Sequence, residues 1–133
     1  MRRLLLCLLA SGLPIACPAA PPDNGSKAVQ SERWATPVKH DANLYRIDDK
    51  LYRSEQPVAE DGEAIVKLGI QSVINLRFFD RNDDDHLKAY GLTLLNRPLL
   101  SWSIKPKEIA EILYLIEKQQ QNGAVLIHCY HGA

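Results

Sequence analysis

The residues best suited to chemistry lie in one short stretch, residues 128–133 (HCYHGA). The continuous apolar run before it, at 124–128, is typical of a buried parallel strand. Cys129 is therefore expected at the carboxyl end of a strand, where open α/β sheets bind ligands. Gly132 permits a tight turn that brings backbone N–H groups close to a ligand. The pattern predicts an anion-binding loop that contains a nucleophile.

A thiol in such a loop is suited to attack on phosphorus. A free cysteine has a pKa of about 8.5 and is mostly protonated at neutral pH, but inward-pointing amides favour the thiolate. The same amides hold the oxygens of a phosphate ester while the sulfur attacks. We interpret Cys129 as this nucleophile. The alternative is that a lone cysteine after a strand is a small buried hydrophobe.

The sequence does not indicate a metal site or a cofactor. Its histidines lack the compact spacing of metal ligands, and they are His40, His86, His128 and His131. The aspartates at 83–85 are consecutive, so their side chains do not converge on one ion. Negative charge suits a helix N-terminus, and we expect this run to begin a helix.

The residues before the cysteine alternate between strand and helix patterns. Residues 44–47 and 51–53 are expected to form a hairpin around a turn at 48–50. A helix should begin at Pro57 and run to residue 68, where Gly69 ends it.

The second half continues the alternation. Strands are expected at 71–76 and 92–96, and a helix at 107–121 follows Pro106. Apolar residues recur in this helix at helical spacing and predict one buried face, formed by Ile109, Ile112, Leu113 and Ile116. The order of elements predicts an α/β fold, with a mainly parallel sheet flanked by helices and the cysteine loop at a strand carboxyl end.

The stretch at 128–133 resembles the signature loop of the cysteine-dependent protein tyrosine and dual-specificity phosphatases. That signature reads His-Cys, five variable residues, Arg, and then Ser or Thr. Upstream, residues 51–57 (LYRSEQP), 72–77 (SVINLR) and 98–102 (PLLSW) resemble the entry segment, the next strand and the pre-catalytic loop of the compact dual-specificity branch. The resemblance covers roughly residues 44–133 and is closest to the small bacterial exported phosphatases.

The resemblance implies a phosphatase that hydrolyses phosphotyrosine through a cysteinyl-phosphate, with phosphoserine and phosphothreonine as additional candidates. Its substrate would be a phosphorylated protein or a small phosphoester. Cys129 would be the nucleophile, and His128 would orient the loop and tune the thiol. The phosphate would be bound by the backbone amides of the next residues, which are Tyr130, His131, Gly132 and Ala133.

The sequence departs from the family pattern in two places. The arginine that clamps phosphate would fall two positions after Ala133, so the chain as printed breaks off inside the signature loop, before the Ser or Thr and the helix that follow. The resemblance therefore implies an incomplete domain that is inactive, or nearly so, by itself. The pre-catalytic loop at 101–105 also lacks the family's acidic proton donor. Glu108 and Asp80 are candidates for that role, and neither is assigned.

Two other functions stay open at this stage. A protein without the arginine and the acid would suit a non-catalytic, phosphate-binding pseudophosphatase. A rhodanese-like sulfurtransferase also carries a reactive cysteine in an anion-binding loop. Nucleic acid is not an expected partner, because Lys+Arg and Asp+Glu both number 16 in the 133 residues and the formal net charge is +0.

The first residues predict export. A basic start, an apolar stretch and then small residues, ending near Ala19, are the pattern of a secretory signal peptide at 1–19. The protein is then expected in the periplasm or outside the cell. Cleavage before Cys17, with lipid attached to that cysteine, is the alternative, and only this would tether it to a membrane. We expect a flexible linker at 20–42 and the incomplete phosphatase domain at 43–133.

Overall fold

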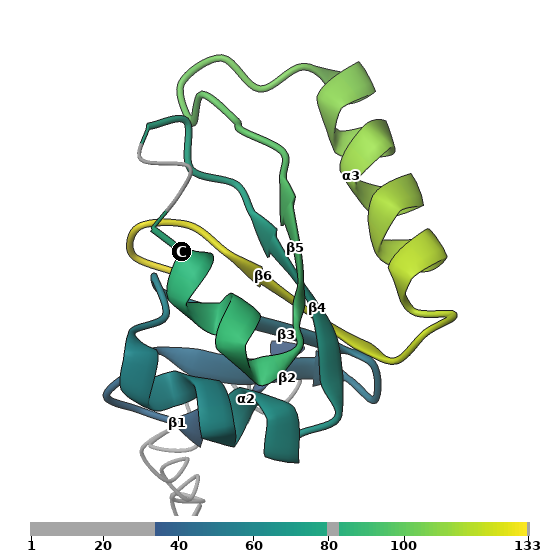
Figure 1. Cartoon of the computed structure of the whole chain (residues 1–133). Coiled ribbons are helices and arrows are strands. Elements are labelled where there is room, and N and C mark those ends of the chain that lie inside the picture. Colours follow the sequence, from purple (N-terminus) through teal and green to yellow (C-terminus); the bar gives the residue numbers. More distant parts are fainter. Residues whose placement is uncertain (1–33, 80–82, 133) are drawn as a thin grey trace, which may run out of the picture.

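The computed structural model describes residues 34–79 and 83–132. The predicted signal peptide and most of the predicted linker lie outside the described residues. In the described part, a six-stranded sheet is flanked by helices (Figure 1). No helix in these two ranges has the length and apolar character needed to cross a membrane.

The strands and helices follow the predicted alternation along the chain. The strands are β1 (Thr36–Lys39), β2 (Leu44–Asp48), β3 (Leu51–Ser54), β4 (Ile70–Asn75), β5 (Thr93–Asn96) and β6 (Ala124–His128). The α-helices are α2 (Gly62–Lys67) and α3 (Pro106–Gln119). Two 3₁₀ helices complete the described elements, namely η1 (Ala59–Asp61) and η2 (Asp85–Tyr90).

The sheet is mixed and mostly parallel. Its strand order is β1-β2-β3-β6-β4-β5. Strand β6 pairs in parallel with β3 on one side and with β4 on the other, and β4 pairs in parallel with β5. Strands β1 and β2 extend the sheet through antiparallel pairing. The predicted α/β fold is confirmed, and so is the predicted hairpin of β2 and β3.

The folded part of the chain begins before residue 43, the predicted start of the domain. The predicted linker ends at residue 42, but Thr36–Lys39 already form β1, and Ala42 is buried in the core. Strand β1 is an edge strand that contains Pro37, and proline is tolerated there because an edge N–H needs no ladder partner. Because the segment contains a proline and is followed by charged residues, its sequence lacks the usual signal of a strand.

One of the predicted helices begins later than predicted, and a second begins where it was expected. Pro57 does not open a helix, because the Val58 N–H donates to Asp61 Oδ2 at 2.9 Å and the chain turns into η1 only at Ala59. The acidic run at 83–85 begins the next helix, as predicted, and this helix is the 3₁₀ helix η2. Gly91 ends that helix with a left-handed φ of 75°.

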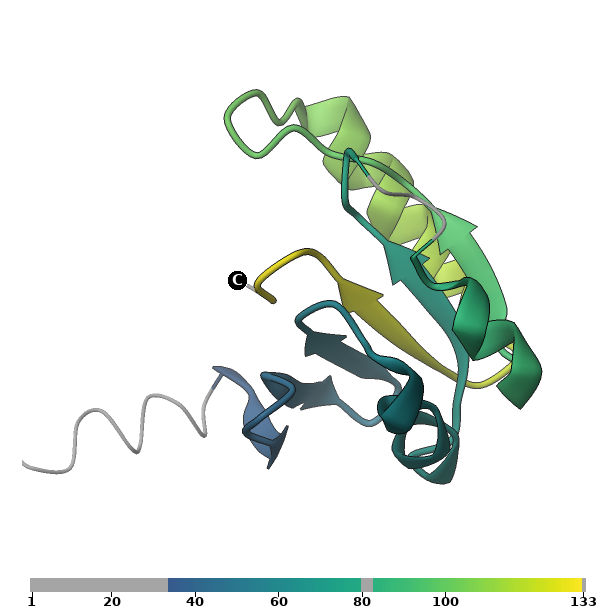
Figure 2. The same ribbon diagram turned by 60° about the vertical axis from the view of Figure 1, so that its left-hand side comes forward.

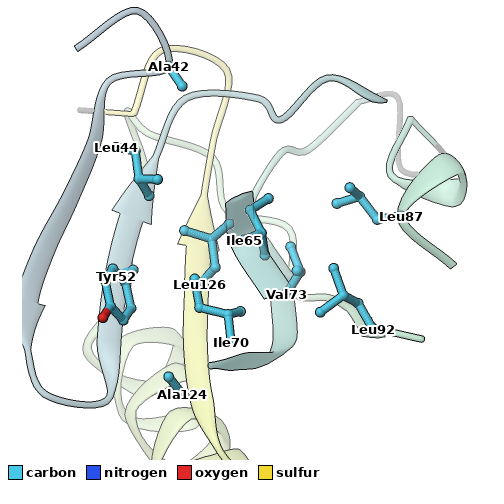
Figure 3. Packing of buried hydrophobic residues seen from close by; sticks show 10 residues of the cluster. All are labelled: Ala42, Leu44, Tyr52, Ile65, Ile70, Val73, Leu87, Leu92, Ala124 and Leu126. Carbon is cyan, nitrogen blue, oxygen red and sulfur yellow. The ribbon is translucent and has the colours of Figure 1, made fainter. Parts of the chain in front are cut away.

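Figure 2 shows the helices packed around the sheet. Each face of the sheet buries a separate apolar cluster. Successive side chains of a strand point to opposite faces. In β6, Leu126 therefore joins Tyr52 and Val73 on the face that α2 covers, and Figure 3 shows it between them. Val125 points the other way, toward α3. Strand β6 therefore contributes side chains to both clusters, one on each face of the sheet.

The apolar face of α3 is narrower than predicted. Ile112 and Ile116 are buried against Ile74 and Val125, with Ile112 only 6% exposed. Leu113 is 60% exposed and Ile109 is also exposed. A stripe around 112 and 116 therefore meets the sheet, and the other two predicted core residues lie on its outer flank.

Neighbouring residues of α2 give a direct test of this packing. Ile65 is 2% exposed and Val66 is 39% exposed. Ile65→Ala should lower the free energy of unfolding by about 2–4 kcal/mol, because it leaves a cavity in the core. Val66→Ala should change it by less than about 1 kcal/mol. Urea unfolding of both variants measures the difference, and equal losses would contradict the assigned face of α2.

Candidate active site

The parallel strands end together at one edge of the sheet, and the cysteine follows the central one. In the sheet register, His128 of β6 lies opposite Ser54 of β3 and Asn75 of β4. The backbone continues the pairing past the strands, since the Leu76 N–H donates to the His128 carbonyl at 2.9 Å. Cys129 therefore lies at the carboxyl end of β6, between two other strand ends.

The loop after β6 turns back on the thiol. The Gly132 N–H donates to Cys129 Sγ at 3.2 Å. Gly132 has a φ of 73°, a conformation that L side chains rarely adopt. A Cβ at this position would also lie 2.5 Å from the backbone nitrogen of Glu55 and 2.6 Å from the carbonyl carbon of Ser54. Only glycine fits here, and its amide favours negative charge on the sulfur.

The two residues between Cys129 and Gly132 have exposed side chains, and their backbone is held by hydrogen bonds. Tyr130 and His131 contact each other edge to face, with ring centroids 4.6 Å apart. The Tyr130 carbonyl accepts a hydrogen bond from the Gln56 N–H at 3.4 Å. Their rings therefore face solvent, while their backbone forms the loop. Ala133, the fourth predicted phosphate-binding residue, lies outside the described residues.

His128 is fully buried beneath the loop and is held by a carboxylate. Its Nε2 lies 2.9 Å from Oδ2 of Asp84, which is also buried. The sequence analysis assigned Asp84 only to the start of a helix. Nothing in a run of three aspartates distinguishes the middle one, and only the fold brings it under β6.

The carboxylate of Asp84 is the centre of a buried hydrogen-bond network. Gln56 Nε2 donates to Asp84 Oδ1 at 2.6 Å, and Gln56 Oε1 accepts from Arg77 Nη1 at 2.6 Å. Burial raises the pKa of Asp84, but the hydrogen bond and charge of His128, together with the bond from Gln56, outweigh it. The pKa of this carboxyl lies below its ordinary value. The network thus runs from Arg77 to His128, the residue that precedes Cys129.

Arg77 is not a surface residue but lies beside the cysteine loop. Its side chain is 8% exposed and forms an ion pair with Asp83 at 2.6 Å. The guanidinium lies over the Tyr130 ring, 5.1 Å from its centroid. The arrangement places a fixed positive charge beside the cysteine loop.

A cleft of about 440 Å³ opens over Cys129. Three loops line it, at 76–79 after β4, 99–102 after β5 and 129–131 after β6. Backbone bonds hold the first two together, since the Leu99 N–H donates to the Leu76 carbonyl at 2.9 Å. Aromatic side chains form much of the wall, namely Phe78, Phe79, Trp102 and Tyr130. The cleft can take a flat, apolar group whose charged end reaches the thiol.

The structure gives one candidate proton donor another role. Glu108 Oε2 accepts a hydrogen bond from the Lys105 N–H at 2.7 Å, so it caps the start of α3. Asp80, the other candidate, lies outside the described residues. Within residues 34–79 and 83–132, no cluster of three His, Cys, Asp or Glu side chains is close enough to hold a metal ion.

The sequence is similar to a characterised phosphatase. It is 30% identical over 105 residues to the dual specificity protein phosphatase TpbA of Pseudomonas aeruginosa, and this alignment covers 79% of the chain. The chain is homologous to this dual-specificity phosphatase. It spans about half the length of the curated TpbA sequences it matches, 47% in each case. No known protein-family model matches the chain.

Solved structures of TpbA share the fold. The crystal structure of Pseudomonas aeruginosa TpbA superposes with a TM-score of 0.71 at 29% identity, covering 77% of this chain and 63% of that one. A Cys→Ser variant of TpbA in complex with phosphotyrosine superposes with a TM-score of 0.70 at 28% identity, covering 77% and 62%. The mixed, mostly parallel sheet with its helices matches this phosphatase-like architecture.

The Asp84 carboxylate makes the stability of the protein depend on pH in a definite direction. Because its pKa is lowered in the folded state, its contribution is present above the unfolded pKa of about 3.9 and is lost as the pH falls through the folded value. Asp84→Asn should lower the free energy of unfolding at pH 7 by about 1–3 kcal/mol, and the difference from wild type should shrink below about pH 4. Denaturant titrations at several pH values measure it.

The neighbouring aspartate is the control for this experiment. Asp85 forms an exposed ion pair with Lys88, so Asp85→Asn should cost no more than about 0.5 kcal/mol at any pH. Equal stability of the two variants at pH 7 would contradict a supporting role for the Asp84–His128 pair.

Proposed function

We propose that this protein is a protein phosphatase that hydrolyses phosphotyrosine through a cysteinyl-phosphate on Cys129. The observation that carries the proposal is the Gly132 amide at the Cys129 sulfur, at the end of the central strand and under an open cleft. Homology to TpbA supports the activity, and the phosphotyrosine bound by a TpbA variant supports the substrate class.

The residues in the site supply the first step of such a reaction. The thiolate of Cys129 attacks phosphorus, an S–P bond forms, and the P–O bond to the leaving group breaks. Loop amides such as that of Gly132 stabilise the negative charge on sulfur before the attack and on the phosphoryl oxygens during it. Water then attacks phosphorus, releasing inorganic phosphate and restoring the thiolate.

The leaving group favours phosphotyrosine over phosphoserine and phosphothreonine. A phenol has a pKa of about 10, so phenolate can depart with less help from a proton donor than a far more basic alkoxide. Residues 101–105 hold no carboxylate, and Glu108 is occupied at the start of α3. The aromatic wall around Phe79 and Trp102 also suits a phenyl ring. Both features support aryl phosphates as the preferred class.

We also propose that the protein acts after export, in the periplasm or outside the cell. The signal-peptide pattern at 1–19 supports this location. Membrane attachment would follow only from lipidation at Cys17. Globomycin, which blocks lipoprotein signal cleavage, should leave processing unchanged if cleavage follows Ala19.

Removal of the nucleophile is the first test of the function. Cys129→Ser should lower the turnover of a phosphotyrosine peptide by at least about a thousandfold, because a hydroxyl is not ionised at neutral pH. Binding of the peptide should persist. Rates measured by phosphate release, with and without a chelator, test the mechanism.

Two results would overturn the proposal. Phosphate release by Cys129→Ser at the wild-type rate would exclude the thiol as nucleophile. Transfer of sulfur from thiosulfate to cyanide, without any phosphate release, would indicate a sulfurtransferase instead. Binding of the peptide without turnover, even when the chain is extended by the family's arginine and hydroxyl residues, would favour the pseudophosphatase.

The 133 residues by themselves should be a poor catalyst. No arginine follows Cys129 in the printed sequence, so this polypeptide has no bidentate clamp from the loop for the transferring phosphoryl group. Its turnover of a phosphotyrosine peptide is expected to be at least about a hundredfold slower than that of a version extended by the family's arginine and hydroxyl residues. Equal rates for the two polypeptides would show that another group binds the phosphate.

A further inference from the structure

The turn between β1 and β2 holds a residue in an unusual conformation. Asn43 has a φ of 45°, and it is the one non-glycine residue with positive φ in the described part of the chain. Asparagine is among the few residues that tolerate this region. Backbone strain of this kind clusters at functional sites. Its side chain is therefore the next feature to consider.

The Asn43 side chain reaches the cysteine loop. Its Nδ2 donates to the carbonyl oxygen of His131 at 2.7 Å. The turn itself is closed by a different bond, from the Asn43 backbone N–H to the His40 carbonyl at 3.2 Å. The side chain is thus not needed for its own turn, and its described bond goes to the loop.

The bond fixes the direction of one peptide group. The His131 carbonyl and the Gly132 N–H belong to the same planar trans peptide, so they point in opposite directions. With the carbonyl held by Asn43, the N–H faces Cys129 Sγ, to which it donates at 3.2 Å. A flipped peptide would present an oxygen to the sulfur and repel a thiolate.

The next carbonyl along the loop, that of Gly132, also accepts a hydrogen bond from a side chain. Arg53 Nη1 donates to the carbonyl oxygen of Gly132. The Arg53 guanidinium is itself positioned over the ring of Tyr45, 4.3 Å from its centroid, and these residues are directly opposite in the β2–β3 pair. Two successive carbonyls of the loop therefore have side-chain donors from the β1–β3 part of the sheet.

We propose that Asn43 is a positioning residue, which orients the 131–132 peptide so that its N–H serves the Cys129 sulfur and, in the reaction, the phosphoryl oxygens. Its use in catalysis rests on the phosphatase function proposed above. Arg53 supports the same orientation through the next peptide. Asn43 touches neither the sulfur nor the substrate, so it acts through the backbone of the loop.

The test removes the amide while keeping the turn. Asn43→Gly fits the positive φ and should preserve the melting temperature. Asn43→Asp keeps the shape and the tolerance of positive φ, but a carboxylate cannot donate to the His131 carbonyl. Asn122→Asp, in the exposed turn that precedes β6, is the matched control for the change of charge. All variants are made in the whole printed chain extended by the family's arginine and hydroxyl residues, because the 133 residues by themselves are expected to be a poor catalyst.

Two measurements follow the loop and the reaction separately. Amide hydrogen exchange at His131 and Gly132, read by NMR, should become about tenfold faster in both Asn43 variants. For phosphotyrosine hydrolysis, kcat should fall by about tenfold with a smaller change in KM, since a misdirected donor costs less than a removed one. The Asn122 control should match wild type in both measurements.

The outcomes separate this proposal from the proposed function. Wild-type exchange and wild-type kcat in Asn43→Gly would overturn the positioning role. If the extended chain without an Asn43 substitution does not hydrolyse phosphotyrosine, the phosphatase function is wrong, and hydrogen exchange alone then decides whether Asn43 orients the loop.

Discussion

The site depends on the direction of a few peptide groups. A peptide cannot turn its N–H toward a sulfur without turning its C=O away, and that oxygen then needs a donor of its own. In the loop after β6, each carbonyl from Tyr130 to Gly132 has such a donor, from Gln56, Asn43 and Arg53 respectively. These donors follow from the hairpin and its flanking turns. The segment that contains β2 and β3 thus supports the loop after β6, which comes last among the described elements.

A second set of contacts supports the same loop from below. His128 is fixed between two strands by the register and by the Asp84 carboxylate. Gln56 takes part in both systems, because its backbone N–H meets the loop and its side chain meets Asp84 and Arg77. The segment around Gln56 therefore connects the Cys129 loop to Arg77, which lines the cleft. This coupling gives a physical reason for the LYRSEQP segment to be a recognisable part of the sequence.

The sequence predicted the parts that depend on local patterns. Strand β6 and the glycine after Cys129 were identified because an apolar run and a tight turn leave clear signals. The strand at 36–39 was missed, since proline and charge conceal a short edge strand. Asp84 and Asn43 could not be found in this way. Their roles arise from contacts with residues far along the chain, at 128 and 131, and such contacts leave no periodic signal.

The strand order carries a consequence for how the molecule is made. Strand β6 lies between β3 and β4, yet it follows all the other described strands in the chain. Its partners Leu51 and Ile70 leave the ribosome long before Val125 and Ala124 do. The two halves of the sheet can join only after synthesis has passed this strand, and pairings of such long sequence separation are slow to form. Until then β3 and β4 each lack the partner strand that joins the two halves of the sheet.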